Sequence, residues 1–510
     1  FIVTVYDKAD LAGLPESSIA QAAEEARKRG LDGMWVFTLH APSRLPVLQY
    51  ADNRGLREAI YKGYTSLASF GENSNLDVIK KIVKLRAEKA KIMGFDNFAQ
   101  MMTSRVMAQT PEAAEELLLK VFEPAVKRSK EEVADMQAYV DKEGGNFKIA
   151  PWDYYYYAGK VKKQKFDLEE SEIRPYFALD NVLKGLFYCA EKLYGIKMIE
   201  MPDAPKYMDE VTVYDVQDAK TGEHISVFMT DYFPRASKRQ GAWMEQLQSA
   251  GQYENGEQKR PIVYNVGNFT RPAGDTPALL TLDEVETTFH EFGHALQGML
   301  TRAKYKSQAG TNVDRDYVEL CSQINEHWAT QPEVLKYYAK HYKTGEAMPD
   351  ELIKKLNDSG KFNQGFTTTE LAGAALLDLA WGKNDGENVD VMAFEKQVGD
   401  QIGMPEEITY RYRSPYFKHI FGDDGYASGY YTYLWSQVLE ADGWELFEEK
   451  GIFDPKTAAS FKKNILESGD EDDATALFVK FRGHKPDAEA LLRLRGFAPA
   501  KDAKKKGKKK

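Results

Sequence analysis

His290 and His294 lie four residues apart in the pattern His-Glu-x-x-His, with Glu291 between them. Residues four apart on an α-helix project from one face, so two neutral imidazoles at this spacing can bind one Zn²⁺ at roughly 2.0–2.1 Å. Glu291 would then lie beside the metal, where its carboxylate can take a proton from a metal-bound water. The pattern also arises by chance, and two histidines on an ordinary surface or core helix are the alternative interpretation.

The residues around this pattern predict a helix over 281–298. Thr281, with Glu284 three residues later, forms a capping-box signature. Asp283 and Glu286 place negative charge in the first turns, which the positive end of the helix dipole favours. No proline interrupts the stretch, and Gly298 lies near its expected end.

A catalytic zinc has three protein ligands and one open position for water, so two histidines are not enough. The next predicted helix, residues 317–330, has Glu319, Gln323 and Glu326 on one face. We expect Glu319 to be the third ligand and Glu326 to accept the outer N–H of a ligand histidine. A surface position is an equally good interpretation of Glu326.

The composition is typical of a globular protein with a large core, since the 510 residues are 43% hydrophobic and 29% charged. This length predicts two or three domains, or one large helical body. The net charge of −10 argues against nucleic acid as the main partner. The two cysteines, Cys189 and Cys321, argue against a disulfide framework and do not support sulfur ligation of the metal.

No run of apolar residues approaches the roughly 18 that a membrane-spanning helix needs, so we expect no membrane partner. The chain starts at Phe1 and its first methionine is Met34, so we expect that the start, with any targeting segment, has been lost. The cytoplasm is the expected location, with the periplasm as the alternative. The expected oligomeric state is a monomer.

The rest of the chain predicts a mainly α-helical protein with a small β-sheet. Apolar residues recur at spacings of three and four over 55–142, whereas 211–216, 224–230 and 262–264 are typical of strands. The sheet comes just before the metal helix, and a strand edge beside a catalytic zinc can pair with an extended peptide. Residues 501–510 are rich in lysine, alanine and glycine, and we expect them to be disordered.

Further motifs occur in the second half of the chain, and the resemblance that they carry covers nearly all of it. They are Phe289-His-Glu-Phe-Gly-His-Ala, Asp316-Tyr-Val-Glu, Ser322-Gln-Ile-Asn-Glu-His-Trp, Gly425-Tyr-Ala-Ser-Gly-Tyr-Tyr-Thr-Tyr-Leu-Trp and Phe481-Arg-Gly-His-Lys-Pro. With these motifs the sequence resembles the thimet oligopeptidase and neurolysin family of zinc metallopeptidases, and within it the bacterial peptidyl-dipeptidase (dipeptidyl carboxypeptidase) branch. Two residues depart from the family pattern: Gln297 where a further histidine is expected, and Cys321 where proline is expected.

The resemblance implies a zincin-like helical clamshell with a deep central channel and the small β-sheet beside the metal helix. It implies His290, His294 and Glu319 as ligands of one Zn²⁺ per chain and Glu291 as the general base. Residues 1–145 would form a helical domain, 146–498 the catalytic zinc domain and 499–510 a disordered basic tail. We expect the long helical segment with which the family begins to be absent from this chain.

The resemblance also implies that His419, Tyr426 and Tyr433 lie on the far wall of the channel, where a tyrosine hydroxyl can stabilise the tetrahedral oxyanion. Tyr430 is a further candidate on the same stretch. Without the resemblance, this Gly- and Tyr-rich segment would be interpreted as a structural loop.

The expected function is zinc-dependent hydrolysis of short peptides with release of C-terminal dipeptides. Arg411 and Arg413 are candidates to hold the free carboxylate of the substrate, with surface charge as the alternative interpretation. An endo-acting oligopeptidase of the same family is the first alternative function, and a non-catalytic peptide-binding protein with a structural zinc is the second. Cobalt or manganese would also suit a His-His-Glu site.

Overall fold

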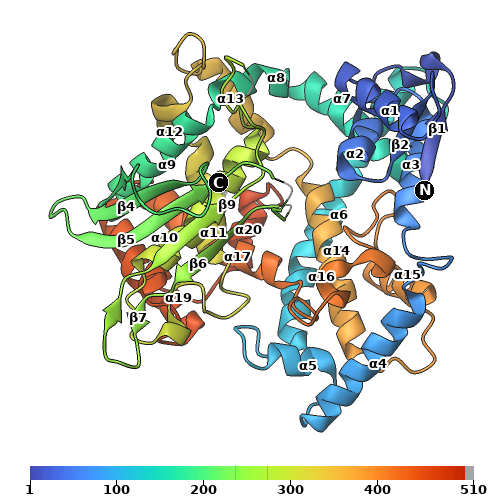
Figure 1. Ribbon diagram of the computed structural model, residues 1–510. Coiled ribbons are helices and arrows are strands. Elements are labelled where there is room, and N and C mark those ends of the chain that lie inside the picture. The colour runs from blue at the N-terminus through green and yellow to red at the C-terminus, as the bar shows by residue number, and fades with distance from the viewer. Residues whose placement is uncertain (236, 240, 273, 500–510) are drawn as a thin grey trace, which may run out of the picture. The chain divides into compact units, whose positions relative to one another are not determined.

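The chain folds into two compact units, each assembled from segments that are far apart in the sequence (Figure 1). The computed structural model describes residues 1–235, 237–239, 241–272 and 274–499. Unit 1 contains Phe1–Ser104, Gln109–Asp167 and Lys361–Tyr431, and unit 2 contains the remaining described residues. The boundary predicted near residue 145 falls inside unit 1. The predicted disordered tail lies, from residue 500 onward, outside the described residues.

Unit 1 is almost entirely helical, with one two-stranded antiparallel sheet near the N-terminus. Its elements are β1 (Ile2–Val5), α1 (Glu16–Arg27), β2 (Trp35–Thr38), α2 (Ala41–Tyr50), α3 (Arg54–Thr65), α4 (Leu76–Ile92), α5 (Phe98–Thr103), α6 (Pro111–Lys142), α7 (Tyr154–Phe166), α14 (Gln364–Lys383), α15 (Val391–Ile402) and α16 (Lys418–Phe421). The helical pattern predicted over 55–142 is therefore confirmed, as helices α3 to α6.

Helices α6 and α14 lie side by side and form the centre of unit 1 (Figure 1). The buried carboxylate of Glu132 on α6 accepts the backbone N–H groups of Gly365 and Phe366, both at 2.9 Å. These N–H groups belong to the first turn of α14, which has no earlier turn to bond them. A Cβ at position 365 would lie 2.4 Å from the backbone nitrogen of Ser129, so glycine permits the close approach of the two helices.

A buried ion pair ties α3 to the turn that precedes α7. The carboxylate of Asp153 accepts from Arg57 Nη2 at 2.8 Å and from Arg54 Nη2 at 2.7 Å. The side chains of Asp153 and Arg57 are 0% and 1% exposed, so each charge depends on the other for compensation. Arg57 also donates to the carbonyl oxygen of Ala51, at the end of α2.

Asp153→Ala is expected to lower the free energy of unfolding by about 3–5 kcal/mol, because it leaves the buried Arg57 charge without a counter-ion. Urea unfolding followed by circular dichroism measures the change. Asp135→Ala is the control, since Asp135 pairs with Lys165 at the surface and should cost less than about 1 kcal/mol. Equal losses in the two variants would contradict the role given to Asp153.

Unit 2 combines a five-stranded sheet with helices. Its helices are α8 (Glu170–Ile173), α9 (Leu179–Tyr194), α10 (Leu282–Leu300), α11 (Leu320–Glu326), α12 (Pro332–Tyr338), α13 (Asp350–Ser359), α17 (Thr432–Lys450), α18 (Pro455–Phe461), α19 (Ala474–Arg482) and α20 (Ala488–Leu494). Its strands are β3 (Ile196–Glu200), β4 (Thr212–Asp218), β5 (His224–Asp231), β6 (Trp243–Gln248), β7 (Gly251–Gln252), β8 (Gln258–Lys259) and β9 (Ile262–Val266).

The sheet has the strand order β3-β4-β5-β9-β6, with β5 and β9 parallel and the other neighbours antiparallel. The three predicted strands correspond to β4, β5 and β9, whereas the edge strands β3 and β6 were not predicted. Strand β6 is half-exposed and lacks an apolar run, which explains the omission. Helix α10 packs on β5, β9 and β6, and the ring of Phe292 on this helix lies 5.4 Å from that of Phe228 on β5.

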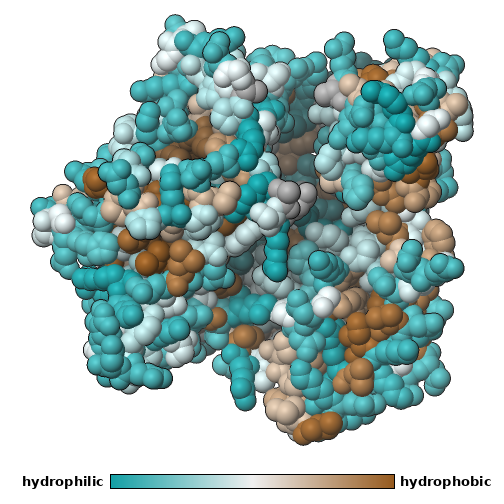
Figure 2. Space-filling model, viewed as in Figure 1, coloured by the Kyte–Doolittle hydropathy of each residue, from teal (hydrophilic) through white to brown (hydrophobic). Residues whose placement is uncertain are grey.

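The visible surface is mostly hydrophilic, with scattered hydrophobic groups (Figure 2). On α4, Val78, Leu85 and Ile92 recur every seven residues and are all exposed. No helix among the described residues combines the length and the apolar character needed to cross a bilayer.

Candidate active site

Helix α10 carries the His-Glu-x-x-His pattern and begins where the sequence predicted. Thr281 Oγ1 accepts the N–H of Glu284 at 3.1 Å, and the Glu284 carboxylate accepts the N–H of Thr281 at 2.8 Å. This reciprocal capping box satisfies two N–H groups at the start of the helix. The helix extends to Leu300, so Gly298 does not end it.

The structure brings the three predicted metal ligands together in unit 2. The Nε2 atoms of His290 and His294 lie 3.3 and 3.1 Å from Oε2 of Glu319. One ligand atom from each residue lies within 4.8 Å of the other two. Two imidazole nitrogens and a carboxylate oxygen are a donor set that Zn²⁺ accepts, and one coordination position stays open.

Glu319 was predicted to lie on a helix, but it immediately precedes α11 as its N-cap residue. Its carbonyl oxygen accepts the N–H of Gln323, and its Oε2 accepts the hydroxyl of Ser322 at 2.7 Å. Burial raises the pKa of the Glu319 carboxyl, but hydrogen bonds from His290 and His294 outweigh burial and hold the pKa well below its usual value. The carboxylate is therefore ionised, as a metal ligand must be.

Glu326 contacts the outer nitrogen of a ligand histidine, as the sequence predicted. Its Oε1 lies 2.6 Å from Nδ1 of His290, so Nδ1 would keep its proton when Nε2 gives up its own to bind a metal. Burial lowers the pKa of His290, but the hydrogen bonds with Glu319 and Glu326 raise it well above the usual value. A metal at Nε2 therefore has to displace a proton. Nδ1 of His294 is buried and has no hydrogen-bond partner among the described residues.

Glu291 lies next to this group on α10 and is 7% exposed. Burial raises the pKa of its carboxyl, whereas the nearby His290 and His294 lower it. A carboxylate with a raised pKa takes up a proton more readily near neutral pH than an ordinary surface glutamate.

Gly293, between the two histidines, allows α10 and α11 to approach each other closely. A Cβ at this position would lie 2.3 Å from the carbonyl oxygen of Cys321 and 2.6 Å from Cα of Ser322. Asn325 Nδ2 donates to the carbonyl oxygen of Phe289 at 2.7 Å and adds a polar contact between the same helices. The position of Glu319 relative to the histidines therefore depends on backbone packing.

Gly293→Ala is expected to push α11 away from α10, lower the stability by about 1–3 kcal/mol and weaken zinc binding. Thermal unfolding and a zinc titration with a competing chelator measure the two effects. Gly298→Ala on the same helix is the control, because its Cβ would meet side-chain atoms rather than backbone: the flexible end of Met244 at 2.8 Å and Cγ2 of Val263 at 3.2 Å. Tight zinc binding by Gly293→Ala would contradict this packing argument.

The predicted aromatic residues divide between the two units. In unit 1 the ring of His419 lies 5.4 Å from that of Tyr430 and 6.1 Å from that of Tyr426. Burial and the nearby Arg411 lower the pKa of His419, so its imidazole is neutral at pH 7. Tyr433 belongs to α17 of unit 2, and its carbonyl oxygen accepts from Gln323 Nε2 on α11 at 3.5 Å.

Arg411 and Arg413 both have carboxylate partners within unit 1. Arg411 Nη1 lies 2.8 Å from Glu370 Oε1, and Arg413 Nε lies 2.6 Å from Oε1 of the buried Glu395. Both guanidinium groups are therefore already paired with a carboxylate, so neither is a free group that waits for a substrate carboxylate, and neither is an unpaired surface charge. The role in substrate binding stays a prediction for both residues.

The sequence reasoning missed Asp378, a buried residue of α14 that holds the tyrosine-rich segment. Its carboxylate accepts the backbone N–H groups of Ser428 at 2.8 Å and Tyr430 at 2.9 Å. Burial raises the pKa of Asp378 to about 7, although the same N–H groups lower it. Ser428 has a left-handed backbone, with φ of 52°, and a Cβ on Gly382 would collide with its hydroxyl. The signal in the sequence was a lone acid in the apolar run Ala-Leu-Leu-Asp-Leu-Ala.

Asp378→Ala is expected to lower the stability by about 2–5 kcal/mol, because two buried N–H groups lose their acceptor. Differential scanning calorimetry and urea unfolding measure the loss. Asp77→Ala, in the first turn of α4 with a side chain that is 87% exposed, is the control within the same unit. An unchanged melting temperature in Asp378→Ala would show that the segment is held in another way.

Comparison with known proteins gives concordant results. The sequence model of "Peptidase family M3" matches residues 47–497. A dipeptidyl carboxypeptidase of Escherichia coli (strain K12) is 41% identical over 500 residues, which cover 97% of this chain and 72% of that protein. An oligopeptidase A of Haemophilus influenzae (strain ATCC 51907 / DSM 11121 / KW20 / Rd) is 36% identical and covers 96% of this chain and 73% of that protein.

Among solved structures, an M32 carboxypeptidase from Deinococcus radiodurans R1 is similar, with a TM-score of 0.48 and 14% sequence identity. The alignment covers 94% of this chain and 83% of that one.

Proposed function

The chain belongs to peptidase family M3, and we propose that it is a zinc-dependent metallopeptidase that releases dipeptides from the C-terminus of short peptides. The observation that carries the proposal is the group formed by His290, His294 and Glu319, with the buried Glu291 beside it. Release of dipeptides is favoured by the 41% identity to a protein named dipeptidyl carboxypeptidase.

The residues present fit one Zn²⁺ per chain. His290 Nε2, His294 Nε2 and a Glu319 oxygen would hold the ion, while Glu326 fixes the tautomer of His290 through Nδ1. When bound, the ion supplies a Lewis acid and lowers the pKa of water to about 7. Cobalt or manganese would suit the same donors.

The remaining chemistry is assigned to side chains of the chain itself. Glu291 takes the proton from the attacking water and passes it to the leaving amine. A hydroxyl of Tyr426 or Tyr433 would donate to the oxygen that becomes negative, because a neutral phenol is a suitable donor for it. His419, neutral at pH 7, packs on the rings of Tyr426 and Tyr430 and would support Tyr426 as that donor.

The substrate is held as an extended strand in this proposal. Strand β6 is an edge of the five-stranded sheet and packs on α10, so its outer backbone groups suit pairing with a peptide. Short peptides are therefore the expected partners. The helical clamshell with a deep channel, the monomeric state and the cytoplasmic or periplasmic location stay predictions.

An endo-acting oligopeptidase is the second candidate, because relatives named oligopeptidase A match over 96% of the chain at 35–36% identity. Such an enzyme would cut within a peptide and would not require a free C-terminal carboxylate. The third candidate, a peptide-binding protein with a structural zinc, would bind peptides without cleaving them.

Digestion of a nonapeptide followed by mass spectrometry distinguishes the candidates. We expect successive loss of two residues from the C-terminus, and protection of the same peptide when its C-terminus is amidated. Internal fragments from both forms would favour the oligopeptidase. Treatment with a chelator should stop cleavage and one equivalent of zinc should restore it. Cleavage that persists in the chelator would contradict the metallopeptidase proposal.

Glu291→Gln is expected to lower kcat by at least about 10²-fold while zinc content is kept, because the amide cannot take up the proton. Stopped assays and metal analysis of the same sample measure both quantities. Asp283→Asn, exposed in the first turn of the same helix, is the matched control and should keep its activity. Unchanged cleavage by Glu291→Gln would remove Glu291 from the mechanism.

A further inference from the structure

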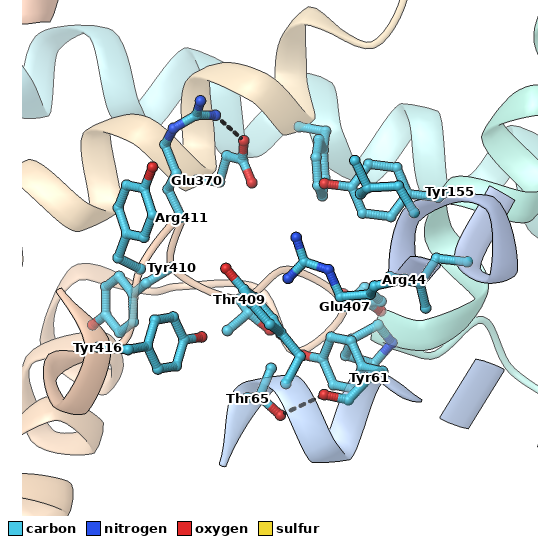
Figure 3. A pocket seen from close by; sticks show the side chains of 16 residues that line it. Arg44, Tyr61, Thr65, Tyr155, Glu370, Glu407, Thr409, Tyr410, Arg411 and Tyr416 are labelled. Atoms are coloured by element: carbon cyan, nitrogen blue, oxygen red, sulfur yellow. Dashed lines mark hydrogen bonds and ion pairs between the residues drawn. The ribbon is translucent and has the colours of Figure 1, made fainter. Parts of the chain in front are cut away.

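Unit 1 contains a cavity of about 220 Å³ (Figure 3). Its lining residues come from α2, α3, α7 and the turn before α7, from α14, and from the segment 407–416, and all of them belong to unit 1. Tyr64, Tyr155, Phe366 and Tyr416 give the cavity aromatic walls. The volume is below the roughly 300–1,000 Å³ of sites for drug-sized ligands, so the occupant is a small molecule.

Arg44 of α2 extends into this cavity with an unpaired charge. Its guanidinium lies 3.4 Å from the centre of the Tyr64 ring, and Figure 3 shows it directed toward the middle of the lining side chains. Within the described part of the chain, its side chain forms no ion pair or hydrogen bond, and its Nε is buried. Arg411, the other cation of the cavity, is paired with Glu370. Arg44 is therefore available for an anion.

Glu407 supplies the opposite charge on the same lining. It is half-buried, and its carboxylate has no ion pair or hydrogen bond to any residue that the structure describes. The cavity thus presents one unpaired guanidinium and one unpaired carboxylate against aromatic walls. An unpaired charge at a partly buried position is unfavourable, so a ligand with both complementary charges would relieve two such positions together.

We propose that this cavity binds a small zwitterion, a free amino acid or a dipeptide. The ligand carboxylate pairs with Arg44, whose planar guanidinium suits two parallel hydrogen bonds to a carboxylate. The ligand ammonium pairs with Glu407, and an apolar ligand side chain packs on the rings of Tyr64, Tyr155 and Phe366.

Tyr412 connects the cavity to the aromatic residues around His419. It lines the cavity, and its ring lies 5.0 Å from that of His419 and 6.3 Å from that of Tyr430. A bound zwitterion would therefore touch a residue that packs directly on His419. Binding itself is measured without any peptide cleavage, so this inference can fail or succeed separately from the proposed function.

Calorimetric titration of the full chain with the dipeptide alanyl-phenylalanine tests the proposal. We expect one binding event per chain that persists after the metal has been removed with a chelator. The C-terminal amide and the N-acetylated form of the dipeptide should each bind about tenfold more weakly or worse, because each loses one charge-assisted contact.

Two variants assign the contacts. Arg44→Gln should weaken the binding of alanyl-phenylalanine about tenfold but change the binding of its C-terminal amide little. Glu407→Gln should likewise weaken the binding of alanyl-phenylalanine about tenfold but change the binding of its N-acetylated form little. Arg27→Gln is the control, because Arg27 is exposed on α1 and pairs with Glu24 at the surface. If Arg44→Gln does not fold, Arg44→Lys and the modified dipeptides on the unaltered chain still provide the comparison.

The proposal is overturned by any of three results. The first is no heat of binding for alanyl-phenylalanine at millimolar concentration. The second is binding that neither Arg44→Gln nor Glu407→Gln weakens. The third is binding that disappears when the metal is removed, which would place the dipeptide at the metal site of His290, His294 and Glu319.

Discussion

The separation of helices α10 and α11 determines whether this chain has a metal site. The two histidines lie on one helix, which sets their spacing, but Glu319 lies at the start of another helix. Because Gly293 has no side chain, the backbone of α11 at Cys321 and Ser322 can lie against α10. That contact, with the Asn325–Phe289 hydrogen bond, brings the Glu319 carboxylate within 3.3 Å of both imidazoles. The chemistry of the site therefore depends on a packing distance.

Buried carboxylates that accept backbone N–H groups recur throughout the chain. Glu132 caps the first turn of α14, Asp378 holds the turn at Ser428, and Glu395 accepts the N–H of Ser414 at 2.7 Å. In unit 2, the fully buried Asp316 accepts the N–H groups of Met107 and Ala108, both at 3.0 Å. Each contact joins segments that are distant in the sequence, so these acids fix irregular segments that helix packing alone would leave without partners.

The sequence predicted the parts of the site that depend on local pattern. The capping box at Thr281, the shared face of His290 and His294, and the strands β4 and β5 follow from spacings of a few residues. It could not predict that 361–431 joins the N-terminal helices, because that grouping depends on contacts over hundreds of residues. Glu319 was correctly grouped with the histidines but wrongly placed within a helix, since helix ends are set by a few competing hydrogen bonds. Asp378 resembled an ordinary helix residue until its partners were known.

The discontinuous make-up of unit 1 has a consequence for synthesis on the ribosome. Helix α14 supplies the partner of α6, yet more than two hundred residues separate the two helices in the chain. The part of α6 that packs on α14 therefore stays uncovered until the later segment has been translated. During that interval the nascent chain is a natural client for chaperones that shield hydrophobic helices.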